Sequence, residues 1–135
     1  MISPERHRIV ISDHPDALAA ALADVRALAE RSGLADRAAD AALAVAELVA
    51  NAREHGSPPV RVDAWVDGRL VIEVHDAGGG FEARPVWGAH PPAPLGTRGR
   101  GLWIVRQLAD LVEVGRGPDG ALVRMELTHE PQIGA

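Results

Sequence analysis

Three polar residues within residues 46–56, AELVANAREHG, are spaced so that one helix face would carry all of them. Glu47, Asn51 and His55 follow one another at intervals of four residues, and residues four apart lie on the same side of a helix. These groups are costly to bury without partners. An amide oxygen can ligate a hard cation, and a carboxylate one turn away can reach a nucleophile. A solvated helix face explains the same spacing, because polar stripes on helices are ordinary.

Two further segments combine charged residues with glycine. Residues 71–82, VIEVHDAGGGFE, indicate a strand that runs into Asp76 and a glycine run, where backbone without side chains lets a ligand approach closely. In residues 96–105, GTRGRGLWIV, glycines precede a helix, whose free N–H groups and dipole favour an anion. Plainer interpretations are an ordinary Asp-Gly turn for the first segment and a flexible loop meeting a helix for the second.

The hydrophobic pattern predicts the elements that must position these residues. Period-two alternation and β-branched density predict five strands, and spacings of three and four predict three helices. Proline near a helix start and glycine after a helix end mark the boundaries, with Asp36 as the N-cap of the second helix. The predicted strands cover residues 7–12, 60–66, 69–75, 112–116 and 121–127, and the predicted helices cover residues 15–33, 37–54 and 102–111.

Between residues 76 and 101 the chain is rich in glycine and proline and shows no periodicity. A connection of this length in a compact domain is usually a functional loop or lid, or else disordered. The order of elements predicts one α+β domain over residues 1–135, a two-layer sandwich in which helices cover one face of a mostly antiparallel, mixed sheet. The tail, residues 129–135, is expected to be flexible.

Composition excludes several classes of protein. The 135 residues include no cysteine, which excludes disulfide scaffolds and cysteine–zinc sites. A net charge of −5, with three Trp, one Phe and no Tyr, argues against nucleic-acid binding, which normally needs a basic face or stacking aromatics. No apolar run approaches the roughly 20 residues of a membrane span, and the start lacks a signal-peptide core, so a cytoplasmic location is expected.

The order of the three segments resembles one known superfamily. A helical Glu-x-x-x-Asn, a strand-end Asp-x-Gly-x-Gly and a helix-opening Gly-x-Gly resemble the Bergerat-fold, histidine-kinase-like ATPases. The segments ELVANAREHG, DAGGGF and RGRGLWIVRQLAD are most similar to those of the anti-sigma-factor serine kinases of the SpoIIAB/RsbW type. The resemblance covers essentially the whole chain. Other nucleotide folds fit poorly, because a P-loop sequence is absent and GGGFEA does not open a helix within a βαβ unit.

The resemblance implies a role for each polar residue of the second helix. Glu47 would be the general base that deprotonates a partner's serine, and Asn51 would ligate Mg²⁺ that bridges the ATP phosphates. One amide oxygen suffices for magnesium, because phosphates and waters complete its octahedron. His55 would contact phosphate or, in the interpretation that we favour, serve the helix end structurally.

The resemblance implies roles for the two glycine segments as well. Asp76 would accept the adenine amino hydrogen, with Gly78 and Gly80 allowing the base to approach, and residues 81–98 would form the ATP lid. The chain has no lysine, so arginine would supply any positive charge to the phosphates. The planar guanidinium group of arginine suits this task. The residues implied at the phosphates are Thr97, Arg98, Gly99, Arg100, Gly101 and Leu102.

One position departs from the family pattern. The family usually carries a Gly-Thr or Gly-Ser pair near its end, whose hydroxyl helps to bind adenine, whereas this chain has Gly120-Ala121. Loss of one hydroxyl removes a hydrogen bond worth about 1 kcal/mol net. ATP binding is therefore expected to be several-fold weaker than with the hydroxyl present.

The resemblance implies an ATP-binding anti-sigma factor with serine/threonine kinase activity. Such a protein would phosphorylate an anti-anti-sigma partner of the STAS type, sequester a sigma factor and form a homodimer. The alternative is a non-catalytic module that uses ATP, or nothing, to shape a protein interface, and Ala121 motivates it. Partner-free ATP hydrolysis comes third, because the sequence shows no transducer domain to couple hydrolysis to motion.

Overall fold

The computed structural model describes residues 6–12, 14–78, 100–117 and 120–128. The lid expected over residues 81–98 and the tail of residues 129–135 lie outside this part of the chain. In chain order the elements are β1 (His7–Ile11), α1 (Ala17–Arg31), the 3-10 turn η1 (Ala35–Arg37), α2 (Ala38–His55), β2 (Val60–Val66), β3 (Leu70–Asp76), α3 (Arg100–Leu108), β4 (Leu111–Gly117) and β5 (Gly120–Leu127).

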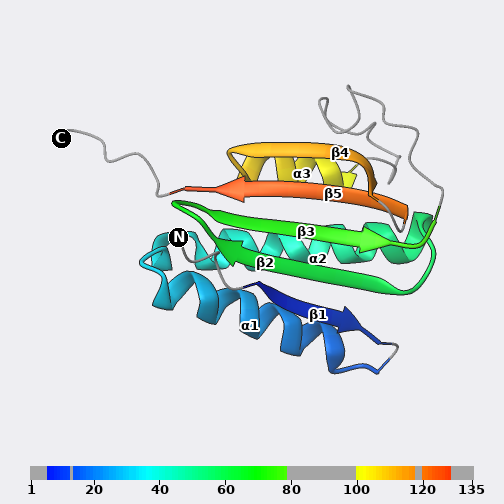
Figure 1. The fold of residues 1–135 in the computed structure, drawn as a ribbon, viewed down its shortest axis with the longest axis horizontal. Coiled ribbons are helices and arrows are strands. Elements are labelled where there is room, and N and C mark those ends of the chain that lie inside the picture. Colours follow the sequence, from blue (N-terminus) through cyan, green and yellow to red (C-terminus); the bar gives the residue numbers. More distant parts are fainter. Residues whose placement is uncertain (1–5, 13, 79–99, 118–119, 129–135) are drawn as a thin grey trace.

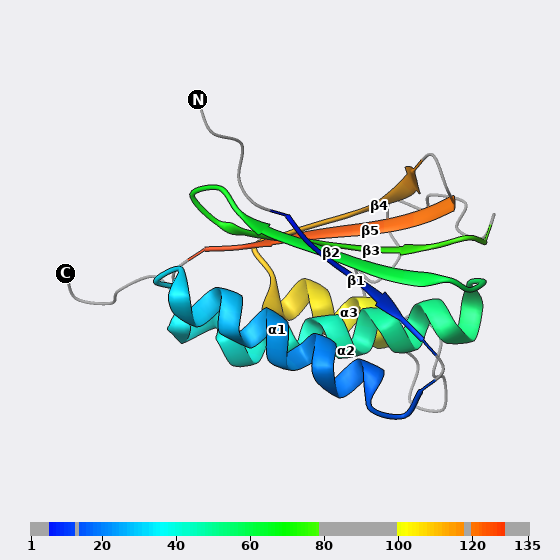
Figure 2. The ribbon, with the colours of Figure 1, turned by 60° about the horizontal axis from the view of Figure 1, so that its bottom comes forward.

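The strands form one five-stranded sheet in the order β1-β2-β3-β5-β4 (Figure 1). All four pairings are antiparallel, so the described strands include no parallel pair. Helices α1, α2 and α3 lie on the same face of the sheet, and none of the described helices covers the other face (Figure 2). The predicted two-layer α+β fold is therefore confirmed.

Alternation along each strand separates an inner face, toward the helices, from an outer face. Inner-face residues of neighbouring strands are paired by register, for example Ile72 with Met125 and Val74 with Val123. Together with the buried side of α2 they make one hydrophobic core. Its largest fully buried side chains are Leu48, Leu70, Ile72, Met125, Leu127, Val25, Val45, Val49, Val62 and Val105.

Some element boundaries differ from the sequence prediction. Asp36 is not an N-cap, because residues 35–37 form the turn η1 and α2 begins at Ala38, after Arg37. The third helix begins two residues earlier than predicted and ends three residues earlier. It ends at Leu108 because the N–H of Asp110 already bonds to the carbonyl of Glu126 in β5, at 2.9 Å, and so leads into strand pairing.

Helices α2 and α3 pack side by side and run in opposite directions. The Arg37 guanidinium at the start of α2 donates to the Leu108 carbonyl at the end of α3, at 2.5 Å. The C-terminus of α2, the end of β3 and the N-terminus of α3 therefore lie at one end of the molecule (Figures 1 and 2). No helix in the described ranges is long and apolar enough to cross a membrane.

Candidate functional site

Asp76 ends β3 on the sheet face that the helices cover. Alternation places it on the same side as Val74 and Ile72, and only 5% of the residue is exposed. Its Oδ1 atom accepts two backbone hydrogen bonds, from the N–H of Gly78 at 2.7 Å and from the N–H of Ser57 at 3.3 Å. Within the described part of the chain no group donates to Oδ2. Among the described residues, backbone N–H groups therefore hold one carboxylate oxygen, and the other can accept a donor from a ligand.

Three glycines approach Asp76 too closely for a side chain to replace their hydrogen atoms. A Cβ atom on Gly56 would lie 2.5 Å from Asp76 Cγ, and one on Gly78 would lie 2.8 Å from Oδ1. On Gly120, whose φ is 141°, a Cβ atom would lie 2.2 Å from the Asp76 carbonyl oxygen. Close backbone approach is the common use of glycine. Here it fixes the position and the orientation of one carboxylate.

The connection between α2 and β2 ties the end of the helix to the end of β3. Gly56 closes the last turn of α2, with its N–H bonded to the Ala52 carbonyl at 2.8 Å. Ser57 then donates its N–H to Asp76 and accepts the N–H of Ala77, at 2.8 Å, with its carbonyl oxygen. Two hydrogen bonds of the Ser57 backbone, one of them to the Asp76 carboxylate, therefore hold the C-terminal end of α2 against the end of β3.

The polar stripe of α2 does not lie wholly in solvent. Asn51 is 8% exposed, and its amide has no hydrogen-bond partner among the described residues. Glu47, one turn earlier, is half-buried and likewise makes no ion pair or hydrogen bond there. Buried polar groups are normally partnered, so an amide and a carboxylate left without partners on adjacent turns fit a ligand site. The Asn51 amide oxygen suits Mg²⁺, a hard cation that requires few protein ligands.

His55, at the C-terminus of α2, has an ordinary local partner. Its Nε2 atom lies 3.8 Å from Glu54 Oε2, and a quarter of its side chain is exposed. A basic residue in the last turn of a helix interacts favourably with the helix dipole when it is charged. The structural role that we favour from the sequence and the phosphate contact both stay predictions for His55.

The N-terminus of α3 is the part of the candidate site that is expected to face phosphate. Residues 100–102, Arg-Gly-Leu, form the first turn of α3, and the N–H groups of a first helical turn have no partner within the helix. Such N–H groups, together with the helix dipole, favour a bound anion. The other candidate residues of the glycine segments, Gly80, Thr97, Arg98 and Gly99, lie outside the described residues.

The position that departs from the family pattern lies directly across from Asp76. In the pairing of β3 with β5, Ala121 is the partner of Asp76, and it is 2% exposed. Its N–H bonds to the Gly78 carbonyl at 3.1 Å. A methyl group therefore lies beside the carboxylate, where a hydroxyl would offer a further polar contact.

A family model describing a histidine kinase-like ATPase domain matches residues 11–127. The chain belongs to this family. Membership implies that the chain binds ATP, and it agrees with the Bergerat-type arrangement of three helices on an antiparallel sheet. No curated protein matches the chain.

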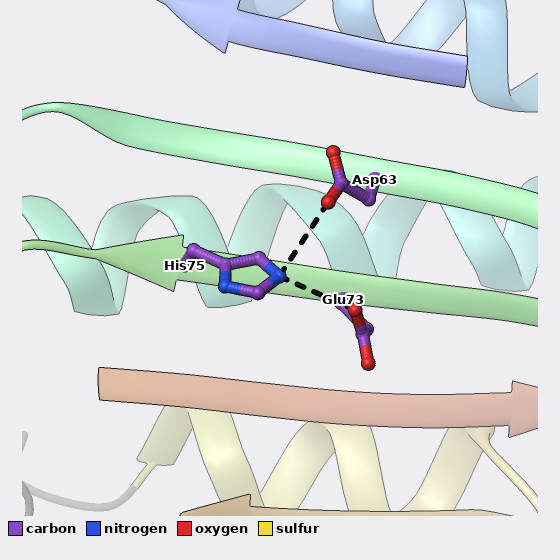
Figure 3. A group of neighbouring side chains, drawn as sticks. All are labelled: Asp63, Glu73 and His75. Atoms are coloured by element: carbon purple, nitrogen blue, oxygen red, sulfur yellow. Dashed lines mark hydrogen bonds and ion pairs between the residues drawn. The ribbon is translucent and has the colours of Figure 1, made fainter. Parts of the chain in front are cut away.

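This ATPase domain also has a polar cluster on the outer face of its sheet, made by Asp63, Glu73 and His75 (Figure 3). His75 Nε2 lies between the two carboxylates, 3.3 Å from Glu73 Oε1 and 3.6 Å from Asp63 Oδ2. Asp63 and Glu73 are direct cross-strand partners. Like charges directly opposite one another destabilise a sheet, so this pair depends on neighbouring positive groups.

Arginines supply those positive groups. Arg8 Nε lies 3.1 Å from Asp63 Oδ1, Arg61 Nε lies 3.4 Å from Oδ2, and Arg124 Nη1 lies 3.7 Å from Glu73 Oε2. One imidazole and two carboxylates have the donor atoms of a metal site. However, a divalent cation would have to join three guanidinium groups that already neutralise the carboxylates. The outer-face cluster is therefore best explained as a structural ion-pair network.

Sequence reasoning missed both the α2–β2 connection and the outer-face cluster. The sequence indicates Gly56 only as a helix stop and indicates no role for Ser57. The cluster could have been found from period two, which places Asp63 on the outer face of residues 60–66 and Glu73 and His75 on the same face of residues 69–75. The contact of Ser57 with Asp76 has no such local signal, because it forms between segments 19 residues apart.

Proposed function

We propose that the chain is an anti-sigma factor with serine/threonine kinase activity. It would transfer the γ-phosphoryl group of ATP to a serine of an anti-anti-sigma, STAS-type partner and would sequester a sigma factor. One observation carries the proposal: Glu47 is half-buried, has no partner in the described part of the chain and stands one turn from the buried Asn51. The partner classes and a homodimeric state rest on the family resemblance.

In this mechanism the serine oxygen forms a bond to the γ-phosphorus while the bond from that phosphorus to the β,γ-bridging oxygen breaks, so ADP leaves. The serine proton passes to Glu47, the general base. Asp76 would hold the adenine, Asn51 would ligate Mg²⁺, and the first-turn N–H groups of α3 would contact phosphate oxygens. Mg²⁺ supplies charge neutralisation on the phosphates, and phosphoryl transfer asks mainly for such neutralisation and for positioning.

Replacement of the base tests the catalytic part of the proposal. With γ-labelled ATP, Mg²⁺ and a STAS-type partner, the wild-type chain is expected to give labelled phosphoserine. Glu47→Gln removes the base and keeps the shape of the side chain, so single-turnover transfer should slow by about 10²–10⁴-fold while ATP affinity stays close to that of the wild type. Glu30→Gln is the matched control, because Glu30 is exposed on α1 and away from the site.

Two outcomes would contradict the kinase proposal. The first is absence of transfer from wild-type protein to every STAS-type candidate while ATP binding is intact. The second is transfer by Glu47→Gln at the rate of Glu30→Gln. Equal loss of ATP affinity and of transfer in Glu47→Gln would instead assign Glu47 to nucleotide binding, which also removes it from the role of base.

A non-catalytic, ATP-dependent interaction module is the second candidate, and Ala121 favours it. Its buried methyl group across from Asp76 suits a protein that binds the nucleotide more weakly than a chain with a hydroxyl at this position. Regulation in cells separates the two functions. If Glu47→Ala leaves regulation intact while Asn51→Ala abolishes it, the working function is binding; if both abolish it, the kinase is supported.

A further inference from the structure

Among the described residues, the two oxygens of the Asp76 carboxylate differ in their hydrogen bonds. Oδ1 already accepts the N–H groups of Gly78 and Ser57, at 2.7 and 3.3 Å. Oδ2 has no donor in the described ranges, although the residue is 5% exposed. A carboxylate with both oxygens free can receive two donors side by side. Asp76 cannot do so without giving up its own backbone bonds.

Rotation cannot exchange the two oxygens easily. Gly56 and Gly78 pack on the carboxylate so closely that a Cβ atom on either would lie within 2.5 to 2.8 Å of its atoms. The Ser57 carbonyl, which bonds to Ala77 N–H at 2.8 Å, ties the same connection to the residue after Asp76. The α2–β2 connection therefore fixes which oxygen is held and which is presented.

A single presented acceptor distinguishes between purines. A 6-amino purine offers an N–H donor at position 6, whereas a 6-oxo purine offers an oxygen acceptor there and its donors on the adjoining edge. An acceptor that faces Oδ2 leaves both groups desolvated and without a hydrogen bond, which is more costly than a missing contact. Across the strand, Ala121 offers only a methyl group, so no hydroxyl from that position can compensate.

We propose that the connection at Gly56 and Ser57 is a base-selectivity determinant: its N–H bond and close packing hold Asp76 as a single acceptor that selects 6-amino over 6-oxo purine nucleotides. Ser57 is a positioning residue in this proposal, because it acts through Asp76. The proposal rests on the proposed placement of the adenine at Asp76, and it adds a source of selectivity on a different segment of the chain.

Asparagine at position 76 should reverse the preference. The oxygen of the Asn amide must occupy the Oδ1 position, because only an acceptor can receive the two backbone N–H groups. The NH₂ group then takes the place of Oδ2 and presents a donor, which suits a 6-oxo purine. Ser57→Pro tests the same argument from the other side, because proline has no N–H. Gly56 has φ −102° and ψ −158°, an extended conformation that lies outside the α region disfavoured for a residue before proline.

The experiment measures dissociation constants for Mg·ATP and Mg·ITP by calorimetry on the full chain. The wild type is expected to bind ATP at least about tenfold more tightly than ITP, and Asp76→Asn should bind ITP more tightly than ATP. Ser57→Pro should lower the ATP preference about five- to tenfold. Ser57→Ala keeps the N–H and removes only the hydroxyl, so it is the matched control and should keep the wild-type ratio.

The ratio of ATP affinity to ITP affinity decides whether the connection at Gly56 and Ser57 controls base selectivity. Equal binding of ATP and ITP by the wild type, or an unchanged ratio in folded Ser57→Pro, overturns the inference and leaves the proposed kinase in place. If Ser57→Pro does not fold by circular dichroism, Asp76→Asn decides, and an undiminished ATP preference in that variant overturns the inference. A wild-type chain that binds neither nucleotide contradicts the proposed function itself.

Discussion

Asp63 and Asp76 are two buried carboxylates on adjacent strands, and their surroundings differ completely. Asp63 lies on the outer face of the sheet and is 1% exposed, with Arg8, Arg61 and His75 around its oxygens. Asp76 lies on the inner face and is 5% exposed, with backbone N–H donors on one oxygen and none on the other among the described residues. The two residues are almost equally buried, but only Asp63 has positively charged partners among the described residues.

The difference indicates which carboxylate serves stability and which serves binding. A buried charge is tolerated when it is paired and hydrogen-bonded, and the arginines around Asp63 meet that condition within the folded protein. Asp76 has no cationic partner in the described residues, so part of its bonding capacity remains for a ligand. Their burial alone would make the two residues equal candidates for a ligand-binding carboxylate. Their hydrogen-bond and ion-pair partners distinguish Asp76 from Asp63.

Among the residues that pack around Asp76, the largest effect is expected from a methyl group added at Gly56. Gly56→Ala places a Cβ atom 2.5 Å from Asp76 Cγ, so the carboxylate must move. Overpacking of this kind costs about 1–3 kcal/mol, and ATP affinity is expected to fall about 10- to 100-fold by calorimetry. Gly115→Ala is the matched control, because a Cβ atom there meets nothing within 4 Å. Equal ATP affinity in the two variants would show that the packing around Asp76 is irrelevant to binding.

A smaller effect is expected from restoring a hydroxyl across from Asp76. Ala121→Ser adds a polar group at the position that pairs with Asp76 in the sheet, and one net hydrogen bond of about 1 kcal/mol should raise ATP affinity several-fold. The gain should disappear when Asp76→Asn is combined with it, because the two residues would share one site. A gain of the same size in the double variant would place the added contact elsewhere.

The sequence predicted the elements of the fold well because their signals are local. Alternation located residues 60–66 with the bounds of β2, and the apolar pattern located α2 to within one residue at each end. The start of α2 was assigned to the wrong capping residue, since η1 precedes it and Asp36 lies inside that turn. Neither period nor composition distinguishes a 3-10 turn from the first turn of a helix.

The candidate site was predictable in its residue types and not in its contacts. Glu47, Asn51 and Asp76 were identified from spacing and resemblance, and the structure places the end of α2, through Ser57, against Asp76. The asymmetry between the two oxygens of Asp76 depends on the Ser57 N–H and on Gly56, which reach it through tertiary structure. Only the folded backbone shows that contact.

The difference between Asp63 and Asp76 is tested most directly by replacing each of them with Asn in a separate variant. ATP affinity and the free energy of unfolding are then measured for both variants. Asp76→Asn keeps an oxygen for the backbone N–H groups and replaces the presented acceptor by a donor. ATP affinity should fall about a hundredfold, while the free energy of unfolding should change by less than about 1 kcal/mol.

Asp63→Asn removes the charge that faces Arg8, Arg61 and His75. Its free energy of unfolding should fall by about 2 kcal/mol, because the positive groups lose a buried partner, while ATP affinity should stay within about twofold of the wild type. We therefore expect Asp76→Asn to lose ATP affinity and keep its stability, and Asp63→Asn to lose stability and keep its ATP affinity. Loss of ATP affinity in Asp63→Asn, or retained ATP affinity with lost stability in Asp76→Asn, would contradict it.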